Sequence, residues 1–268
     1  MSGSSNNLLP GLCKISETPL LYLPEDHSTP SPRVGEWAKM PRGPLAPWPR
    51  QSPFHDALNR KSMKVITFNV KGLNMPVKRH SLYRDLRAHD ADIVCLQETH
   101  FRRLDHPKLY TPQYLTQYHS TFKTKARGVT LLIHNRVAFQ MHRILKDPKG
   151  RYIILVCTIN SRIYTLVSIY APNAAQSQFL SQVLQKVTDI QSGTLVICGD
   201  LNMGLDPLKD RSSTVTFHNS YSRIDYFLIA GSALPYTIDC IILPLTWSDH
   251  SPVILTLAIC ITKTGPTY

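Results

Sequence analysis

The chain contains 268 residues, of which 43% are hydrophobic, and it carries a formal net charge of +12. This content suffices for one large core or two small ones. No stretch approaches the roughly 18 uninterrupted apolar residues of a membrane span, and no basic region followed by an apolar one marks a secretory signal. The positive balance favours an anionic partner, with nucleic acid as the leading candidate, although solubility alone is an alternative explanation.

Residues 1–62 are predicted to form a disordered, proline-rich leader. They hold ten of the twenty prolines, which remove backbone hydrogen-bond donors, and little apolar surface is present to offset the entropy of ordering. The folded domain is predicted to span residues 63–260, followed by a short tail at 261–268. Four of the six cysteines lie in apolar runs of this domain, so we expect them to be small core residues in a reducing compartment.

Strands and a helix open the predicted domain. Residues 64–70 are rich in β-branched side chains and predict a strand. Residues 79–90 carry apolar side chains at helical spacing, and residues 92–97 predict the next strand. Further strands are expected at 128–134, 152–158 and 163–169, and the last two fit a hairpin.

The second half of the domain is predicted to contain a further helix and four further strands. Residues 177–190 place apolar side chains along one face of an amphipathic helix. Strands are then expected at 194–199, 224–229, 237–243 and 252–259. Continuous apolar strands with intervening helices predict an α/β fold in which helices cover sheets.

Carboxylates stand at the ends of several apolar strands. Glu98 is the only glutamate of the predicted domain, and Asp200 ends a second apolar run. Asp200 and Asn202 are two residues apart, so both would point to one face of an extended segment; an Asx turn explains the pair equally well. Asp225 opens another apolar strand, where a charge needs a partner, and a structural pair with Arg223 would also satisfy it.

An acid and an imidazole are adjacent at Asp249-His250. Adjacent residues face opposite ways in a strand, so a loop or turn is expected here. A histidine that contacts a phosphate should be held in one tautomer by a carboxylate on its other ring nitrogen. Asp225 is the best candidate for that orienting role.

Acids at strand ends, an acid–histidine step and a basic chain together indicate metal-assisted attack on a phosphodiester. The reaction requires neutralisation of charge on phosphorus, an activated water and a stabilised leaving oxygen. Mg²⁺ is the expected cofactor, with Mn²⁺ as an alternative, because Mg²⁺ prefers oxygen ligands and typically takes only one or two carboxylates. A solitary Glu98 at a strand end suits that role.

Six short blocks occur in a fixed order along residues 63–257. They are Thr67-Phe68-Asn69-Val70-Lys71-Gly72-Leu73-Asn74, Gln97-Glu98-Thr99-His100, Ile169-Tyr170-Ala171-Pro172-Asn173, Gly199-Asp200-Leu201-Asn202, Ser222-Arg223-Ile224-Asp225 and Ser248-Asp249-His250-Ser251. Their ordered co-occurrence is specific because independent coincidences multiply. Together they resemble the endonuclease/exonuclease/phosphatase superfamily, and within it the apurinic-type endonuclease domain of LINE-type non-LTR retrotransposons.

This resemblance implies a two-sheet β-sandwich flanked by helices, similar to DNase I, and a metal site at its edge. Glu98 would be the main metal ligand, Asn69 would line the metal site, and Asp249 would lie near a second or alternate metal position. Taken alone, Asn69 is better explained as a strand-end cap.

The resemblance also implies catalytic and substrate-binding roles. Asp200 would orient or deprotonate the attacking water, or protonate the leaving oxygen. His250, oriented by Asp225, would contact the scissile phosphate. The phosphate oxygens would be held by Tyr170 and Asn202, and the substrate-binding positions would be Asn173, Ser248 and Lys71. Taken singly, Tyr170 is better explained as a core aromatic residue and Ser248 as a turn residue.

The segment between Asn202 and Ser222 is shorter than the resemblance implies. Only 24 residues separate Asp200 from Asp225, where the family usually places a helix, a further strand and a loop near the DNA. A deletion is the simplest hypothesis. It would uncover apolar surface or misplace Asp200 relative to Asp225, and a shift of about 1 Å costs on the order of 10²-fold in rate.

The leading hypothesis is a Mg²⁺-dependent DNA endonuclease of retrotransposon descent that nicks one strand. We expect a monomer that acts on DNA, with no membrane partner, no reverse-transcriptase domain in this chain, and nuclear placement that follows from the substrate. The alternatives are a catalytically impaired DNA-binding remnant and a phosphatase of a small phosphorylated substrate. Basic residues that would guide DNA are Lys71, Lys78, Arg79, Arg102, Arg103, Lys123, Lys125 and Arg127. Ordinary solvated surface explains any one of them equally well.

Overall fold

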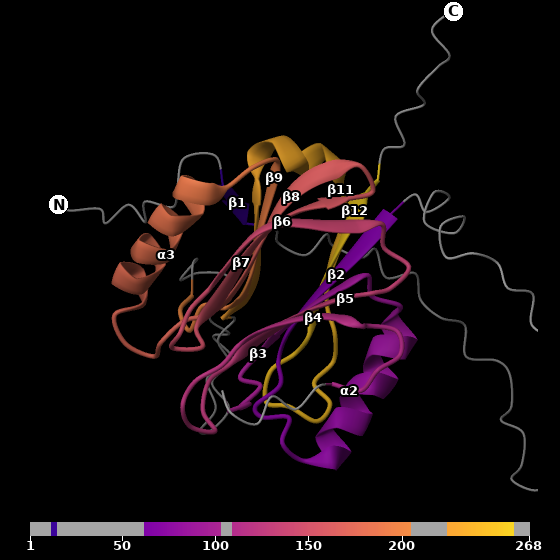
Figure 1. The fold of residues 1–268 in the computed structure, drawn as a ribbon, viewed down its shortest axis with the longest axis vertical. Helices are drawn as coiled ribbons and strands as arrows, with labels where there is room; N and C mark the ends of the chain where they lie inside the picture. Colours follow the sequence, from indigo (N-terminus) through magenta and orange to yellow (C-terminus); the bar gives the residue numbers. More distant parts are fainter. Residues whose placement is uncertain (1–11, 15–61, 103–108, 205–223, 260–268) are drawn as a thin grey trace, which may run out of the picture.

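The computed structural model describes residues 12–14, 62–102, 109–204 and 224–259. Two six-stranded sheets face each other, and a helix lies on the outer side of each (Figure 1). The first sheet has the order β1 (Leu12–Lys14), β10 (Asp225–Ala230), β9 (Thr194–Asp200), β8 (Arg162–Tyr170), β7 (Tyr152–Ile159) and β6 (Phe139–Lys146). The second has the order β11 (Thr237–Ile242), β12 (Val253–Ala258), β2 (Ser62–Asn69), β3 (Ile93–Gln97), β5 (Val129–Ile133) and β4 (Thr116–Ser120). The predicted two-sheet α/β sandwich is confirmed.

Apolar side chains from both sheets fill the space between them. Val65, Ile93 and Leu131 of the second sheet pack in one buried cluster with Leu155, Val196 and Phe227 of the first. Helix α2 (Pro76–His89) covers the outer face of the second sheet through Leu82 and Leu86. Helix α3 (Gln176–Ile190) covers the first sheet through Val183, Leu184 and Val187. Burial of these faces is the main driving force for the layered arrangement.

Local sequence explains several element boundaries. Helix α2 begins at Pro76 because a proline at the first helical position has a suitable φ and loses no hydrogen bond. The predicted β7–β8 hairpin is confirmed: Ile159 pairs with Arg162, and the turn residues Asn160 and Ser161 have φ of 47° and 66°. Two left-handed residues are what a two-residue hairpin turn requires.

Three strands were not predicted. β4 and β6 are edge strands with partly exposed side chains, so their sequences lack a continuous apolar run. β1 lies within the expected leader and pairs with β10, Leu12 opposite Ala230, so the prediction of disorder is wrong for these three residues. The rest of the leader and the tail from residue 260 lie outside the described residues, and the domain boundaries remain predictions.

Two further findings bear on the sequence expectations. Cys95, Cys157, Cys198 and Cys240 are buried free thiols. Within the described ranges, neither helix is long and apolar enough to cross a membrane.

The strand register gathers the predicted site residues at one end of the sandwich. β2 and β3 are parallel, with Asn69 opposite Gln97, so Asn69 and Glu98 emerge at the same edge. In the other sheet β8 and β9 are parallel, with Tyr170 opposite Asp200, and Asp225 at the start of antiparallel β10 also pairs with Asp200.

A buried polar bridge joins the two sheets beneath that edge. Gln97 donates from Nε2 to Thr67 Oγ1 at 3.1 Å in its own sheet and to Ser168 Oγ at 3.0 Å in the other. All three side chains are fully buried. Hydrogen-bonded polar groups in a dry interior specify one relative placement of the layers, because any displacement would leave a donor or acceptor unpaired.

Candidate active site

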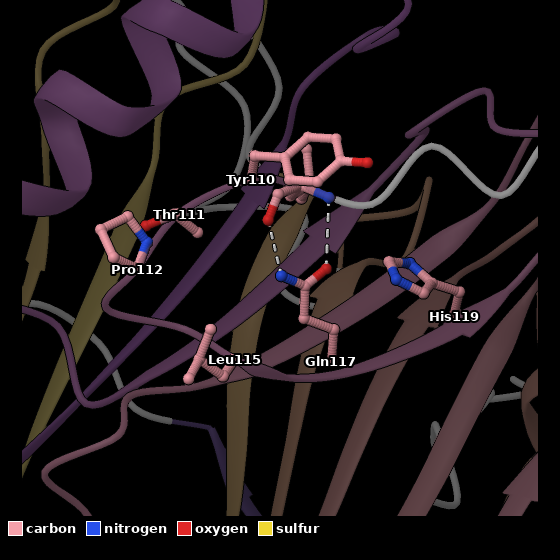
Figure 2. Close-up of a pocket in the computed structure, with 7 residues that line it drawn as sticks. Tyr110, Thr111, Pro112, Leu115, Gln117 and His119 are labelled. Atoms are coloured by element: carbon pink, nitrogen blue, oxygen red, sulfur yellow. Dashed lines mark hydrogen bonds between the residues drawn. The ribbon is translucent and has the colours of Figure 1, made fainter.

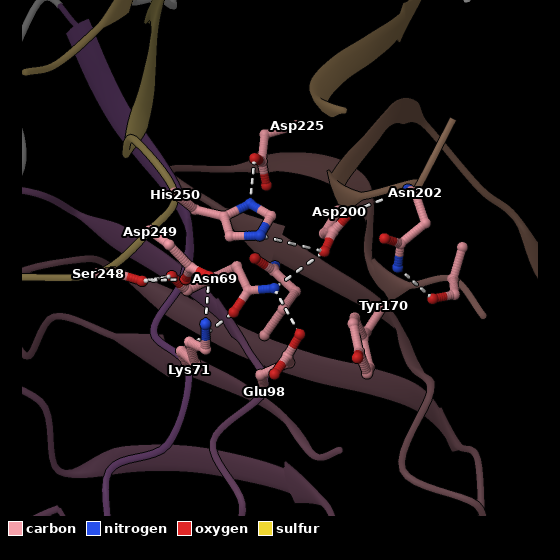
Figure 3. Close-up of polar contacts among 12 residues, drawn as sticks. Asn69, Lys71, Glu98, Tyr170, Asp200, Asn202, Asp225, Ser248, Asp249 and His250 are labelled. Carbon is pink, nitrogen blue, oxygen red and sulfur yellow. Dashed lines mark hydrogen bonds and ion pairs between the residues drawn. The ribbon is translucent and has the colours of Figure 1, made fainter. Parts of the chain in front are cut away.

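Asn69 links two of the predicted carboxylates, Glu98 and Asp200, across the two sheets. Its Nδ2 donates to Glu98 Oε1 at 3.0 Å and to Asp200 Oδ2 at 2.9 Å (Figure 3). Its Oδ1 accepts from the backbone N–H of Lys71 at 3.1 Å. Asn69 is fully buried, so this amide fixes the spacing of both acids.

Glu98 is held as an anion. It has a left-handed backbone with φ of 52°, and its Oε2 lies 3.2 Å from His100 Nε2. Burial would raise the pKa of Glu98, but hydrogen bonds from His100, Asn69 and Tyr170 outweigh burial and lower the pKa to about 2. The carboxylate is therefore ionised at neutral pH.

Asp200 has the opposite tendency. It is buried and accepts the backbone N–H of Asn202 on Oδ1 at 2.9 Å. Burial and the charge of Asp225 raise the pKa of Asp200 to about 6, although His250, Asn69 and Asn202 lower it. A carboxylate with a pKa close to the working pH can both accept and release a proton.

His250 lies between two acids. Its Nδ1 is 2.7 Å from Asp225 Oδ2 and its Nε2 is 3.9 Å from Asp200 Oδ2 (Figure 3). Burial would lower the pKa of His250, but the hydrogen bond and charge of Asp225, followed by the charges of Asp200 and Asp249, raise it to about 9. The predicted orientation of His250 by Asp225 is therefore present in the geometry, and the ring is an imidazolium at neutral pH.

The loop between β11 and β12 brings Ser248 and Asp249 to the site, and the segment after β2 brings Lys71. Lys71 Nζ lies 2.5 Å from Asp249 Oδ2, which is an exposed ion pair on the rim. Ser248 is buried and donates from Oγ to the carbonyl of Asn69 at 2.7 Å. Ser248 therefore joins the histidine-bearing loop to the end of β2.

The remaining predicted residues lie on the β8 and β9 side. Tyr170 hydrogen-bonds with Glu98, and burial followed by the Glu98 charge raises the pKa of its phenol, so the hydroxyl keeps its proton. Asn202 donates from Nδ2 to the carbonyl of Ala171 at 2.7 Å. Asn173 is exposed on the loop that follows β8. Its carbonyl accepts from Gln176, and no side-chain contact joins it to the acidic cluster within the described part of the chain.

Two neighbours of the site were missed from the sequence. His100 contacts Glu98 directly, and Gly72 leaves room for it, because a Cβ at Gly72 would lie 2.9 Å from His100 Nδ1. Arg151 lies over the ring of Tyr170, with Cζ 4.6 Å from the ring centroid. His100 stands inside a recognised block, whereas no local signal points to Arg151.

Two of the basic residues expected to guide DNA have structural partners. Lys78 Nζ donates to the carbonyl of Lys71 at 2.7 Å, and Arg79 Nη1 donates to the carbonyls of Leu73 and Asn74. Both fasten the loop that carries Lys71. Arg103 lies outside the described residues.

A pocket of about 680 Å³ lies elsewhere, beside the edge strand β4 (Figure 2). It is lined by Leu109, Tyr110, Thr111, Pro112, Leu115, Gln117 and His119. These residues include no carboxylate and none of the predicted site residues. The pocket is therefore separate from the acidic cluster.

Two places in the cluster offer groups of the type that bind metals. Asp200, Asp225 and His250 each present an atom within 4.8 Å of the others. Within this trio His250 Nδ1 already lies 2.7 Å from Asp225 Oδ2, so Nε2 is the ring nitrogen that remains open to a further ligand. The oxygens of Glu98 and Asp200, held together by Asn69, match the preference of a hard divalent cation.

A comparison with known families agrees with this geometry. Residues 66–250 match the Endonuclease/Exonuclease/phosphatase family. The chain belongs to this family. The predicted superfamily is confirmed, and with it the prediction that the chain is an enzyme of the hydrolase class.

The chain is also similar to curated proteins and, in its fold, to solved structures. The chain is 26% identical to the DNA repair nuclease APEX1 of Danio rerio, over 74% of this chain and 83% of that protein. It is 25% identical to an exodeoxyribonuclease of Bacillus subtilis (strain 168), over 53% of this chain, and it spans 59% of that protein. The AP endonuclease LMAP of Leishmania major shares the fold, with a TM-score of 0.60, 18% identity, and coverage of 75% and 89% of the two chains.

The family's phosphoester chemistry fits the charges found here. An anionic Glu98 can hold a cation, Asp200 can take a proton from water, and the His250 imidazolium can donate to an oxygen that becomes negative. The Asn69 bridge holds the first two of these groups, and Asp225 holds the third. Preorganised groups of this kind are the usual source of large rate enhancements.

Proposed function

We propose that the chain is a DNA endonuclease of non-LTR retrotransposon descent that uses Mg²⁺ and nicks one strand to leave a 3′-hydroxyl and a 5′-phosphate. The observation that carries the proposal is the Asn69 amide, which bonds Glu98 and Asp200 at once. It places an ionised metal-type ligand and a proton acceptor around one point. The hydrolysis of a phosphodiester requires both.

DNA is the proposed substrate on grounds of charge and relationship. The net charge of +12 favours a polyanion. Two of the similar proteins are described as a DNA repair nuclease and an exodeoxyribonuclease. A DNA substrate also favours nuclear placement. A monomer would suffice, because every residue of the proposed centre comes from one chain.

The retrotransposon descent is supported by the ordered blocks. All six blocks contribute residues to the cluster described above, namely Asn69, Glu98, Tyr170, Asp200, Asp225 and His250. In the block that contributes Asp225, Ser222 and Arg223 lie outside the described residues.

In the proposed reaction each described group has one task. Asp200 accepts a proton from the attacking water, since its pKa of about 6 leaves it ionised at neutral pH. The His250 imidazolium donates a hydrogen bond to a non-bridging phosphate oxygen, and Asp225 keeps the ring oriented. The Tyr170 phenol donates its one proton to Glu98 and so helps to keep that carboxylate ionised. Mg²⁺ bound at Glu98 would neutralise charge on the phosphate and stabilise the leaving oxygen.

The impaired DNA-binding remnant is the principal alternative. This alternative requires that the shortened connection after Asn202 displaces Asp200 from Asp225. The two residues are nevertheless register partners on β9 and β10, and His250 lies within 3.9 Å of the first and 2.7 Å of the second. The enzyme is therefore the better-supported proposal.

The test is nicking of supercoiled plasmid by the purified full chain. We expect Mg²⁺-dependent nicks that EDTA abolishes and DNA ligase reseals, because ligase requires a 3′-hydroxyl and a 5′-phosphate. Glu98→Ala and His250→Ala should each lose activity by about 10²-fold or more. Matched controls are Asp189→Ala and His80→Ala, which remove an exposed acid and an exposed histidine from the helices.

Three outcomes would contradict the enzyme. Nicking that persists in EDTA would exclude the metal-dependent route. Activity that survives Glu98→Ala would exclude the proposed ligand. DNA binding without nicking by the wild-type chain would support the alternative of a catalytically impaired DNA-binding remnant.

A further inference from the structure

Two arginines stand beside the catalytic cluster on the side of Tyr170. Arg151 lies over the Tyr170 ring with Cζ 4.6 Å from the centroid and donates from Nη1 to the carbonyl of Ala171 at 3.0 Å. Arg127 lies over the ring of Phe122, also with Cζ 4.6 Å from the centroid. An aromatic ring beneath each guanidinium restricts its plane. Both cations therefore have defined positions.

Backbone hydrogen bonds tie the arginine pair to the catalytic turn. Gly128 N donates to Gly150 O at 3.1 Å, so the segments that carry Arg127 and Arg151 lie in direct contact. His100 N donates to the carbonyl of Arg127 at 2.7 Å, and His100 contacts Glu98. Backbone hydrogen bonds therefore join the segments of both arginines to the turn that carries the main proposed metal ligand.

The charge of the pair is not balanced by a direct partner. Arg127 and Arg151 are both partly buried, and within the described ranges no carboxylate is hydrogen-bonded to either guanidinium. Asp147 lies near, but its Oδ2 accepts the backbone N–H of Arg151 at 3.0 Å. Burial and the charge of Arg127 both lower the pKa of Arg151. Partly buried like charges with free donors are unfavourable unless an anion joins them.

Neighbouring residues add to the same positive region. Lys123 and Lys125 are exposed in the segment that leads to Arg127, and residues 121–128 contain no acid. A phosphate would therefore meet cations on this side of the cluster and Lys71 on the other.

We propose that Arg127 and Arg151 bind a DNA backbone phosphate next to the one that is cleaved, an inference that rests on the proposed function. Guanidinium groups present planar pairs of donors that match phosphate oxygens. Because Arg151 stacks on Tyr170, and Tyr170 hydrogen-bonds with Glu98, an anion on the pair lies adjacent to the catalytic cluster. The pair would set the register of the strand.

Arg127 is the informative position for a test. Arg151 has a structural task, because it donates to the carbonyls of Ala171 and Tyr170. Arg127 contacts only the Phe122 ring through its guanidinium in the described structure. Substitution of Arg127 should therefore leave folding intact and remove one phosphate contact.

The experiment measures DNA affinity separately from catalysis. A short fluorescent duplex is titrated with the full chain in EDTA by anisotropy at several salt concentrations. Arg127→Ala should weaken binding by about fivefold to tenfold at low salt and reduce the slope of log K against log salt by about 1. Arg127→Lys should retain the slope, and the control Arg143→Ala, which removes an exposed arginine of β6, should match the wild type.

A scan with single neutral methylphosphonate linkages then locates the contact. One position flanking the nick should weaken wild-type binding by about fivefold to tenfold and have little further effect on Arg127→Ala. Equal losses in both proteins at every position, or an unchanged salt slope, would overturn the inference. A wild-type chain that binds in this pattern but does not nick would refute the proposed enzyme and leave the phosphate contact standing. If the Arg127→Ala variant nicks normally and its slope of log K against log salt equals that of the wild type, only the proposed Arg127–phosphate contact is refuted.

Discussion

Asp200 and Asp225 are directly opposed residues of two antiparallel strands, although 24 residues separate them in the chain. His250 lies within 2.7 Å of Asp225 and 3.9 Å of Asp200. Two acids around one imidazole favour a state with one proton on the ring and none on Asp200. The pH range of that state sets the range in which the proposed chemistry operates.

The rate should therefore have a bell-shaped dependence on pH. Below about pH 6 Asp200 binds a proton and cannot accept one from water. Above about pH 9 His250 loses its proton and can no longer donate to the phosphate. We expect kcat/KM on a fluorescent oligonucleotide to fall on both sides of this window, with apparent limits that belong to the coupled groups. A profile with no alkaline limb between pH 8 and pH 10 would contradict the role of His250.

Substitution of Asp225 should shift the alkaline limit. Asp225→Asn removes the main charge and hydrogen bond that raise the pKa of His250, so the pKa should fall from about 9 towards the ordinary 6.5. NMR titration of the His250 ring proton measures this directly. Asp249→Asn is the matched control, because Asp249 makes the smallest contribution of the three acids.

The interaction of Asp225 with His250 should also make the stability of the fold depend on pH. Because the folded pKa of His250 is raised, its contribution is complete below about pH 6.5 and is lost as the pH rises through about 9. The stability difference between wild type and Asp225→Asn should therefore shrink from pH 6 to pH 10. A difference that is independent of pH would show that Asp225 acts through packing alone.

Asp200→Asn should abolish nicking yet stabilise the fold. A raised carboxylate pKa means that ionisation opposes folding, so stability from Asp200 is lost as the pH rises through about 6. The neutral amide removes this cost at neutral pH but cannot accept two hydrogen bonds as the carboxylate does from Asn69 and Asn202. A net gain of about 1 to 2 kcal/mol is expected from these opposing effects. Urea denaturation at pH 7.5 and at pH 4.5 measures it, and the gain should disappear at the lower pH.

The fold was predictable where strands are buried on both faces. β3 and β9 are continuous apolar runs, each with a polar residue where it leaves the core, so both the strands and their terminal acids stand out. β4 and β6 have partly exposed edge positions and carry no such pattern. β1 depends on pairing with β10, more than 200 residues away in sequence.

The site was predictable as a set of residues but not as a set of contacts. Ordered blocks located Glu98, Asp200 and His250. The Asn69 bridge depends on the packing of one sheet on the other, and the Glu98–His100 contact depends on left-handed φ angles of 52° and 58°. Neither is encoded in local composition. The phosphate contact of Asn202 and the substrate-binding role of Asn173 remain predictions.

Lys71 should compete with a metal ion for the acidic rim. Its ammonium lies 2.5 Å from Asp249 and is also influenced by the charge of Glu98. Lys71→Ala should therefore increase the affinity for Mn²⁺, measured by electron paramagnetic resonance, by about two- to fivefold, as expected for an exposed ion pair. Lys186→Ala, an exposed lysine of α3, is the control. Unchanged or weaker Mn²⁺ binding by Lys71→Ala would place the ion away from this rim.

Gly199 should be required for the placement of Asp200. Its φ is +133°, and a Cβ added there would lie 2.0 Å from the backbone oxygen of Ile169 on β8. We expect Gly199→Ala to lose about 3 kcal/mol or more, because backbone strain and overpacking act together. The displaced β9 end would also misplace Asp200 and Tyr170 and lower the rate of the folded fraction by about 10²-fold.

Gly193 provides the matched control at the other end of the same strand pair. A Cβ there would lie 2.0 Å from the backbone oxygen of Ile163, and φ is +68°. Gly193→Ala should therefore cost comparable stability, while the folded fraction keeps its rate at low temperature because the site lies at the opposite end of β9. Thermal unfolding combined with nicking assays below the transition separates the two effects. Equal loss of rate in both variants would mean that strain spreads along β9 and that Gly199 has no special relation to Asp200.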